Sequence, residues 1–303
     1  MSDDSELEVA LVDAFTEDPL AGNPAGVVPD AEGLSEEQMQ AIARELSVSE
    51  TAFLQPSGPA DRKVRYFTPT EEVDLCGHAT IGSHVYLRET RDLSAGEHTL
   101  ETNVGVLDVE IDEDGVVWMT QDSPEFREVD LEHDRVADAL GIDGVALREL
   151  EIDLPLAVAS TGLPFLVVPA TYFRQVSGAD PDPAAIEALC EEVGATGLYL
   201  FTFDALSPDA TLHGRMFAPG AGVPEDPVTG TASGAVGAYL RRTDAFGGDL
   251  PDELLLEQGH VLDRPGEVRV EVGEEIRVGG AGVTSLEGAV AVPEIESDEI
   301  VEA

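Results

Sequence analysis

The chain has 303 residues, of which 62 are Asp or Glu and 16 are Lys or Arg, so its formal net charge at pH 7 is −46. A surface this acidic repels phosphate backbones and anionic membranes, so we expect no nucleic-acid partner and no membrane partner. The acids are spread along the chain, which favours adaptation of the whole surface to a salty cytoplasm over one dedicated acidic binding patch.

The length fits two domains of about 150 residues each. Cys76 and Cys190 are the only cysteines and match neither a metal-binding nor a disulfide pattern. Residues 1–8 are polar and acidic without an apolar signal core, and no apolar run approaches the ~20 residues of a membrane span. These features predict a cytoplasmic protein.

The first half of the chain alternates strand and helix signals. The helix signal is a capping box at Ser35 and Gln38, followed by an apolar stripe. In chain order we expect strands at 9–15 and 24–29, a helix from Ser35, strands at 52–55 and 65–69, a glycine turn at Gly77 with a second helix, and a hairpin that alternates over 107–111 and turns at Asp114-Gly115.

The second half repeats this order. Arg65-Tyr-Phe-Thr-Pro69 and Leu75-Cys-Gly-His-Ala-Thr-Ile-Gly82 return as Arg215-Met-Phe-Ala-Pro219 and Val228-Thr-Gly-Thr-Ala-Ser-Gly234. Other echoes come in the same order, among them 24–29 with 164–169 and 100–102 with 256–258. Several matches in register indicate two similar halves, with the active site between them. We expect an α+β fold of two pseudo-symmetric halves, residues 1–123 and 124–303, each a mostly antiparallel, barrel-like sheet around a central helix. The final strand is free to pack on the first half.

The turns at Gly77 and Gly230 are candidate anion sites. Each precedes a helix whose first N–H groups lack partners and carry partial positive charge, so two such turns facing one cleft would hold a carboxylate or an enolate oxygen. A single glycine of this kind is more often only a tight turn. The repetition of the motif favours function.

Glu50 lies where the first helix gives way to an apolar strand. Partial burial there would raise its pKa toward the range useful for proton transfer, although a surface glutamate is the ordinary alternative in so acidic a chain. His78 and Asp226 lie in the two glycine turns, where capping and turn formation are the ordinary roles. The other histidines show no metal-ligand spacing, so we expect no metal site.

Several motifs together resemble the phenazine-biosynthesis isomerase (PhzF-like) family. They include Val12-Asp-Ala-Phe15, Gly22-Asn-Pro-Ala-Gly26, Ser47-Val-Ser-Glu-Thr51, Cys76-Gly-His-Ala79 and Pro224-Glu-Asp-Pro-Val-Thr-Gly-Thr231. The resemblance covers nearly the whole chain. It implies a diaminopimelate epimerase-like fold, a homodimer, and a proton shift on a small amino or hydroxy carboxylate, such as a dihydro-hydroxyanthranilate, without cofactor or metal.

The resemblance also implies roles for individual residues. Glu50 is expected to be the acid/base, with His78 and Asp226 flanking the substrate. Four further residues are expected to bind polar groups of the substrate: Asn23, Gly77, Gly230 and Thr231.

Two alternatives remain at this point. Racemases of this fold use one cysteine from each half, and here Cys76 has Thr229 as its counterpart, so an epimerase would need another acid. A binding protein that kept the fold without catalysis is the second alternative.

Overall fold

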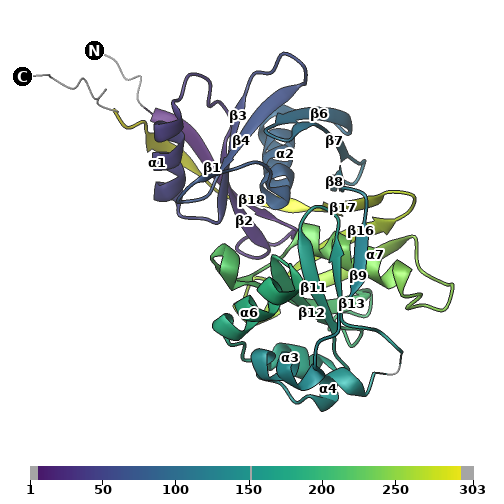
Figure 1. The fold of residues 1–303 in the computed structure, drawn as a ribbon. Coiled ribbons are helices and arrows are strands. Elements are labelled where there is room, and N and C mark those ends of the chain that lie inside the picture. Colours follow the sequence, from purple (N-terminus) through teal and green to yellow (C-terminus); the bar gives the residue numbers. More distant parts are fainter. Residues whose placement is uncertain (1–5, 151, 295–303) are drawn as a thin grey trace, which may run out of the picture.

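The computed structural model describes residues 6–150 and 152–294. Figure 1 shows two lobes stacked end to end, each with a sheet that curves around one long helix. Within the described ranges, no helix combines the length and the apolar composition that a membrane-spanning helix needs.

The first lobe contains both ends of the described chain. Its elements are β1 (Glu6–Ala14), β2 (Asn23–Val28), α1 (Glu36–Leu46), β3 (Glu50–Gln55), β4 (Arg62–Phe67), β5 (Glu72–Val73), α2 (Gly77–Arg91), β6 (Gly96–Thr102), β7 (Gly105–Ile111), β8 (Val117–Thr120) and the last strand, β18 (Gly282–Ala291). Because β18 pairs antiparallel with β1, the chain returns to its starting lobe.

The second lobe contains the rest of the described chain. Its elements are β9 (Glu125–Glu128), α3 (His133–Leu140), α4 (Val145–Arg148), β10 (Ala157–Ser160), β11 (Pro164–Pro169), α5 (Phe173–Ser177), α6 (Pro183–Val193), β12 (Gly197–Thr202), β13 (Leu212–Ala218), η1 (Pro219–Ala221), β14 (Val223–Asp226), α7 (Gly230–Arg242), β15 (Glu253–Gln258), η2 (His260–Leu262), β16 (Gly266–Val272) and β17 (Ile276–Gly280).

The strand order is the same in both lobes. The first runs β18-β1-β2-β3-β4-β6-β7-β8 and the second β9-β10-β11-β12-β13-β15-β16-β17, with an antiparallel β8–β17 pair joining them. The pairs β2–β3 and β4–β6 are parallel, as are β11–β12 and β13–β15, and the other pairs are antiparallel. The predicted α+β fold of two pseudo-symmetric, mostly antiparallel halves is confirmed. The division at residue 123 stays a prediction.

The central helices α2 and α7 form the core of the molecule. Residues 79–87 of α2 are all buried, and so are residues 232–240 of α7. Glycines let the surrounding strands approach: a Cβ on Gly237 would lie 2.7 Å from Cγ1 of Val270. The two helices share one apolar cluster with the inner faces of both sheets, so the lobes are packed as one body.

The outer faces of the two sheets are covered by further helices. In the first lobe α1 supplies one with Met39, Ile42 and Ala43, and its predicted capping box is present. In the second lobe α6 packs on the outer face of the sheet together with α3, α4 and α5. The comparison of the two halves in the sequence did not predict these three helices. These three helices span only four to eight residues, too few turns for a clear helical period.

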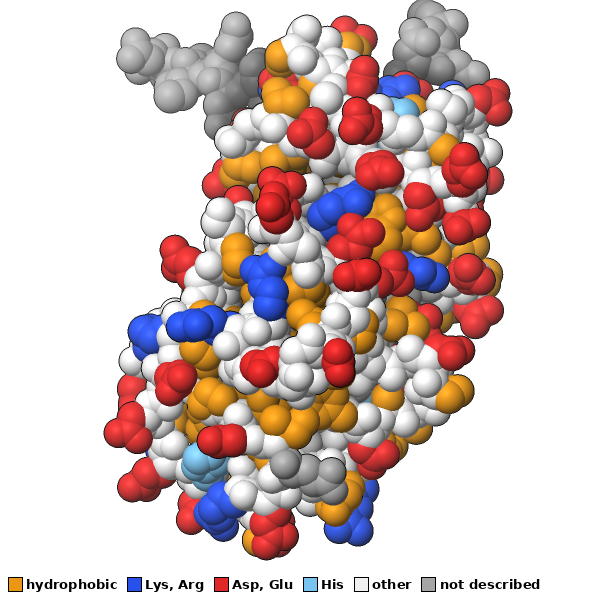
Figure 2. Space-filling view, turned by 90° about the vertical axis from the view of Figure 1, so that its right-hand side faces the viewer, with side chains coloured by type: hydrophobic (Ala, Val, Ile, Leu, Met, Phe, Trp, Pro, Cys, Tyr) orange, Lys and Arg blue, Asp and Glu red, His pale blue; other side chains and the backbone are white. Residues whose placement is uncertain are grey.

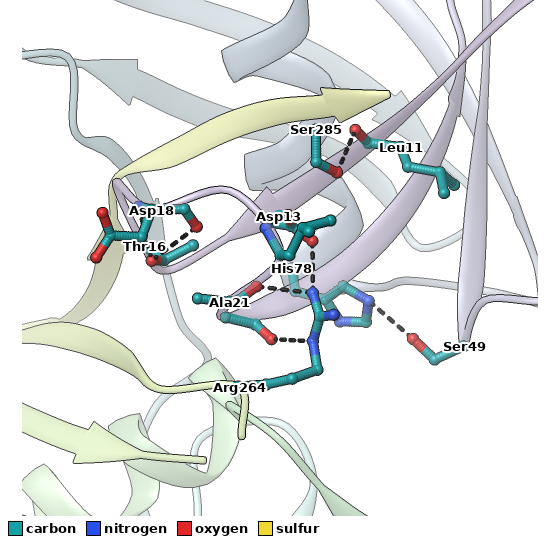
Figure 3. Close-up of polar contacts among 11 residues, drawn as sticks. Leu11, Asp13, Thr16, Asp18, Ala21, Ser49, His78, Arg264 and Ser285 are labelled. Carbon is teal, nitrogen blue, oxygen red and sulfur yellow. Dashed lines mark hydrogen bonds and ion pairs between the residues drawn. The ribbon is translucent and has the colours of Figure 1, made fainter. Parts of the chain in front are cut away.

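Arg264 ties the second lobe to the first. Its guanidinium donates to Oδ1 of Asp13 at 2.5 Å and to the carbonyl oxygens of Ala21 and Gly22 at 2.7 and 2.9 Å (Figure 3). Asp13 is buried, and its second oxygen accepts the Leu20 N–H at 2.7 Å. This contact fixes the loop that leads into β2, and therefore fixes Asn23, the first residue of that strand.

Acidic side chains are spread over both lobes on the face of the molecule that Figure 2 shows. Figure 2 shows Asp and Glu scattered over that whole face, with few Lys or Arg among them. The spread matches the even distribution of acids along the chain.

Candidate active site

The N-termini of α2 and α7 meet where the two lobes join. Gly77 and Gly230 are the first residues of these helices, and a Cβ on Gly77 would lie 4.0 Å from Oγ1 of Thr231. Among the described residues, no side chain caps the N-terminus of either helix. The positive ends of both helix dipoles therefore point toward one region.

Glu50 stands beside the N-terminus of α2. Helix α1 ends at Ser47 in a left-handed conformation (φ 55°), and Glu50 then begins β3, two residues earlier than the strand expected at 52–55. Its side chain is 22% exposed, and Oε2 lies 3.4 Å from Nε2 of His78. The carboxylate is therefore partly shielded from water, yet a small substrate can reach it.

His78 connects Glu50 to Cys76. Its Nε2 lies 3.2 Å from Oγ of Ser49 as well as near Glu50, and its Nδ1 lies 3.4 Å from Sγ of Cys76 (Figure 3 shows the Ser49 contact). The ring tautomer decides which contact donates: with its proton on Nε2, the ring would donate to Oγ of Ser49 and Nδ1 would accept from the thiol.

Cys76 is held as a thiol. Burial raises the pKa of its S–H well above the ordinary value, and the charges of Glu50 and Asp226 raise it further, while backbone N–H groups of Ala79 and His78 oppose the rise. A thiol in this state is a poor base at neutral pH.

Asp226 is the acid that the second lobe contributes. Burial raises its pKa to about 6, and the charge of Glu50 adds to the rise, against the opposing effects of His78, Thr229 and Asn23. Its Oδ2 accepts the Thr229 hydroxyl, and its Oδ1 accepts Nδ2 of Asn23 at 2.9 Å. Near neutral pH a fraction of Asp226 therefore keeps its proton.

Asn23 and Gln258 support Asp226 from the two lobes. Nδ2 of Asn23 also donates to the carbonyl oxygen of Val228 at 2.8 Å, and Nε2 of Gln258 donates to the backbone carbonyl of Asp226 at 2.7 Å. Oδ1 of Asn23 is buried and has no partner within the described part of the chain.

The structure brings together the residues singled out from the sequence: Asn23, Glu50, Gly77, His78, Asp226, Gly230 and Thr231 surround the paired helix N-termini. Their roles stay predictions. Sequence reasoning missed the contacts of Ser49 and Gln258. Both residues lie in segments singled out from the sequence, next to Glu50 and Glu257. Their position beside an acidic residue was the only sign in the sequence that they contact the site.

One group of potential metal ligands lies here. Single donor atoms of Glu50, Cys76 and His78 all lie within 4.8 Å of one another.

Comparison with known proteins now gives the family. A family model described as "Phenazine biosynthesis-like protein" matches residues 12–288. The chain belongs to this family. It is 39% identical over 274 residues to "Uncharacterized isomerase YfhB" of Bacillus subtilis, covering 89% of this chain and 92% of that protein.

Two further relatives extend the comparison. Trans-2,3-dihydro-3-hydroxyanthranilate isomerase of Pseudomonas chlororaphis is 30% identical, with 93% of this chain and 98% of that protein covered. The crystal structure of a Bacillus anthracis phenazine biosynthesis protein of the PhzF family is 34% identical, with a TM-score of 0.87 over 95% of this chain and 99% of that chain. The expectation of a PhzF-like isomerase is confirmed at the level of family and enzyme class.

Proposed function

We propose that this isomerase shifts a proton on a small carboxylate that also bears an amino or hydroxyl group, with Glu50 as the acid/base and with no cofactor or metal. The observation that carries the proposal is the meeting of two acids from different lobes, Glu50 and Asp226, at two uncapped helix N-termini.

The helix N-termini bind the negative charge of the substrate. The substrate carboxylate, and the enolate-like charge that forms when a carbon proton leaves, would be stabilised by the N–H groups that follow Cys76 and Thr229. The substrate named for the Pseudomonas chlororaphis relative, a dihydro-hydroxyanthranilate, carries a carboxylate, an amino group and a hydroxyl group.

The proposed step moves one proton from one carbon of the substrate to another, with Glu50 as its carrier. Glu50 takes a proton from an acidic carbon, the electron pair moves along the conjugated system, and Glu50 returns the proton at a neighbouring carbon. Nε2 of His78 lies 3.4 Å from Oε2 of Glu50, so the imidazole ring packs beside the carboxylate. Asp226, which keeps its proton for part of the time, donates a hydrogen bond to the developing charge. The step requires no oxidant or reductant.

Enzyme-dependent deuterium uptake tests the proposal. Amino, hydroxy and dihydroaromatic acids are incubated with the protein in D2O, with and without chelator, and followed by NMR. We expect uptake at a carbon next to a carboxylate-conjugated system, unchanged by chelator and lost in Glu50→Gln. Uptake that depends on Cys76 but not on Glu50 would instead establish the epimerase. Ligand binding without any exchange would establish the binding protein.

A further inference from the structure

The thiol of Cys76 has no part in the proposed proton shift, although it lies among the residues that perform it. Cys76, Glu50 and His78 present one sulfur, one carboxylate oxygen and one imidazole nitrogen within 4.8 Å of one another. Sulfur with nitrogen is the donor combination that Zn²⁺ and related thiophilic ions prefer, whereas Mg²⁺ and Ca²⁺ prefer oxygen alone.

The spacing of two of these donors already suits one ion. Zinc binds sulfur at about 2.3 Å and nitrogen at about 2.0 Å, so two such ligands of a tetrahedral ion lie about 3.5 Å apart. Sγ of Cys76 and Nδ1 of His78 are 3.4 Å apart. An ion between them would replace the S–H···N contact without moving either backbone.

Glu50 supplies the third ligand by a side-chain rotation. Its Oε2 lies 3.4 Å from Nε2, on the other edge of the His78 ring, and a carboxylate oxygen of Glu50 already lies within 4.8 Å of Sγ of Cys76, so a rotation toward Nδ1 would bring it to an ion held there. Asp226 lies close enough for its charge to act on the thiol, and therefore adds negative potential that attracts a cation.

We propose that Cys76, His78 and Glu50 form a binding site for a thiophilic divalent cation of the Zn²⁺ class, and that the bound ion inhibits the isomerase. The ion takes the thiolate after the S–H proton leaves to solvent, with no change of oxidation state, and water fills the remaining position. Because Glu50 becomes a ligand, its lone pairs are no longer available to a substrate carbon. The inhibitory part rests on the proposed function, whereas the binding part does not.

Cadmium absorption tests the binding part without a substrate. Cd²⁺ is titrated into the full-length, metal-free protein, and the ultraviolet sulfur-to-cadmium charge-transfer band is followed. We expect a band that saturates at one ion per chain in the wild type and is absent in Cys76→Ser. Neither dilution nor a change of buffer should restore the band in that variant. His78→Gln should weaken binding by more than about 10-fold.

Cys190→Ser is the matched control, because Cys190 is also buried but lies on α6, away from this cluster. This variant should keep the band and the affinity. Thermal melts of each variant show whether it is folded. The proposal is overturned if the folded wild type gives no band, or if the band survives Cys76→Ser and disappears with Cys190→Ser.

Inhibition is measured separately. Deuterium exchange should fall as Zn²⁺ saturates the site and recover fully with chelator. If the wild type binds Cd²⁺ through Cys76 but exchanges no substrate proton, the result supports the metal site and refutes the proposed function. A protein that exchanges protons normally while Zn²⁺ is bound refutes the inhibitory part of this proposal.

Discussion

At the candidate active site the two lobes have the same backbone arrangement, but they differ in the acidic residues that they place there. Glu50 begins β3, and the matching first residue of β12 is Gly197. Asp226 pairs with Met216 in the second lobe, while Val73 takes the matching place in the first. Each lobe therefore contributes a helix N-terminus. Glu50 and Asp226 each come from one lobe, and the matching position in the other lobe has no acid. On the proposed mechanism, the duplicated frame supplies the anion site, and the differences between the copies supply the acid/base chemistry.

A second pair of matched positions differs in burial. Lys63 lies 3.7 Å from Glu101 across β4 and β6, with both side chains more than a quarter exposed. The matching residues in the second lobe, His213 and Glu257, are 3.0 Å apart and almost fully buried. The same strand pairing thus carries a surface ion pair in one lobe and a buried contact between Nδ1 of His213 and Oε1 of Glu257 in the other.

The largest effect is expected from removing the acid that only the first lobe has. Glu50→Gln keeps the size of the side chain and removes the base, so the exchange rate should fall by about 10²–10⁴-fold while ligand still binds. Deuterium uptake and ligand titration measure the two quantities.

Two variants calibrate that result. Cys76→Ser should cost much less than Glu50→Gln, and Asp226→Asn should fall between them, because on this mechanism Asp226 orients the substrate and stabilises charge. A folded Cys76→Ser protein without activity, beside a Glu50→Gln protein with near-normal turnover, would make the thiol the base.

The two matched pairs should differ strongly in what they contribute to the stability of the fold. Burial alone would raise the pKa of Glu257, but the hydrogen bond from His213 and those from the Leu206 and Ser207 N–H groups outweigh it and hold the pKa below its usual value. Removing one partner of a buried pair costs about 3–5 kcal/mol, so His213→Ala should lower the stability by that amount. Lys63→Ala should cost at most about 1 kcal/mol. Urea unfolding of both variants checks the contrast, and equal midpoints would contradict it.

The sequence predicted the shared frame better than the differences between its copies. The repeat placed Gly77 and Gly230 at matching helix starts because glycine turns and the Arg-x-Phe-x-Pro strands leave local signals. It did not show that His213 is buried and Lys63 only partly buried, since burial depends on the helices and loops that cover each strand. The Asn23–Asp226 bond joins residues 203 positions apart, and periodicity within short segments carries no information about such a contact.

Asp226 should also cost stability at neutral pH. Its folded pKa of about 6 lies above the ordinary value of 3.8, so the folded state binds the proton more tightly than the unfolded state. The benefit of that proton is full below about pH 3.8 and is lost as the pH rises through 6. Above pH 6, Asp226→Asn should therefore be more stable than the wild type by up to about 3 kcal/mol, and the difference should shrink as the pH falls toward 4. Melting temperatures from pH 4 to 8 test the sign, and an advantage for the variant that grows on acidification would refute it.

The smallest effect separates the two glycines that the repeat makes equivalent. A Cβ on Gly230 would lie 2.9 Å from Cζ of Phe15 and 3.2 Å from Cγ1 of Val278, so Gly230→Ala overpacks the core and should cost about 1–3 kcal/mol. A Cβ on Gly77 would meet only Oγ1 of Thr231, at 4.0 Å, so Gly77→Ala should fold with nearly wild-type stability. The added methyl group would occupy the space where we expect the substrate carboxylate, and ligand affinity should fall. Melting temperature and ligand titration, measured together on both variants, show whether one glycine serves packing and the other serves binding. If Gly77→Ala binds ligand as the wild type does, the empty space beside Thr231 is not the carboxylate site, and the two glycines differ only in their packing.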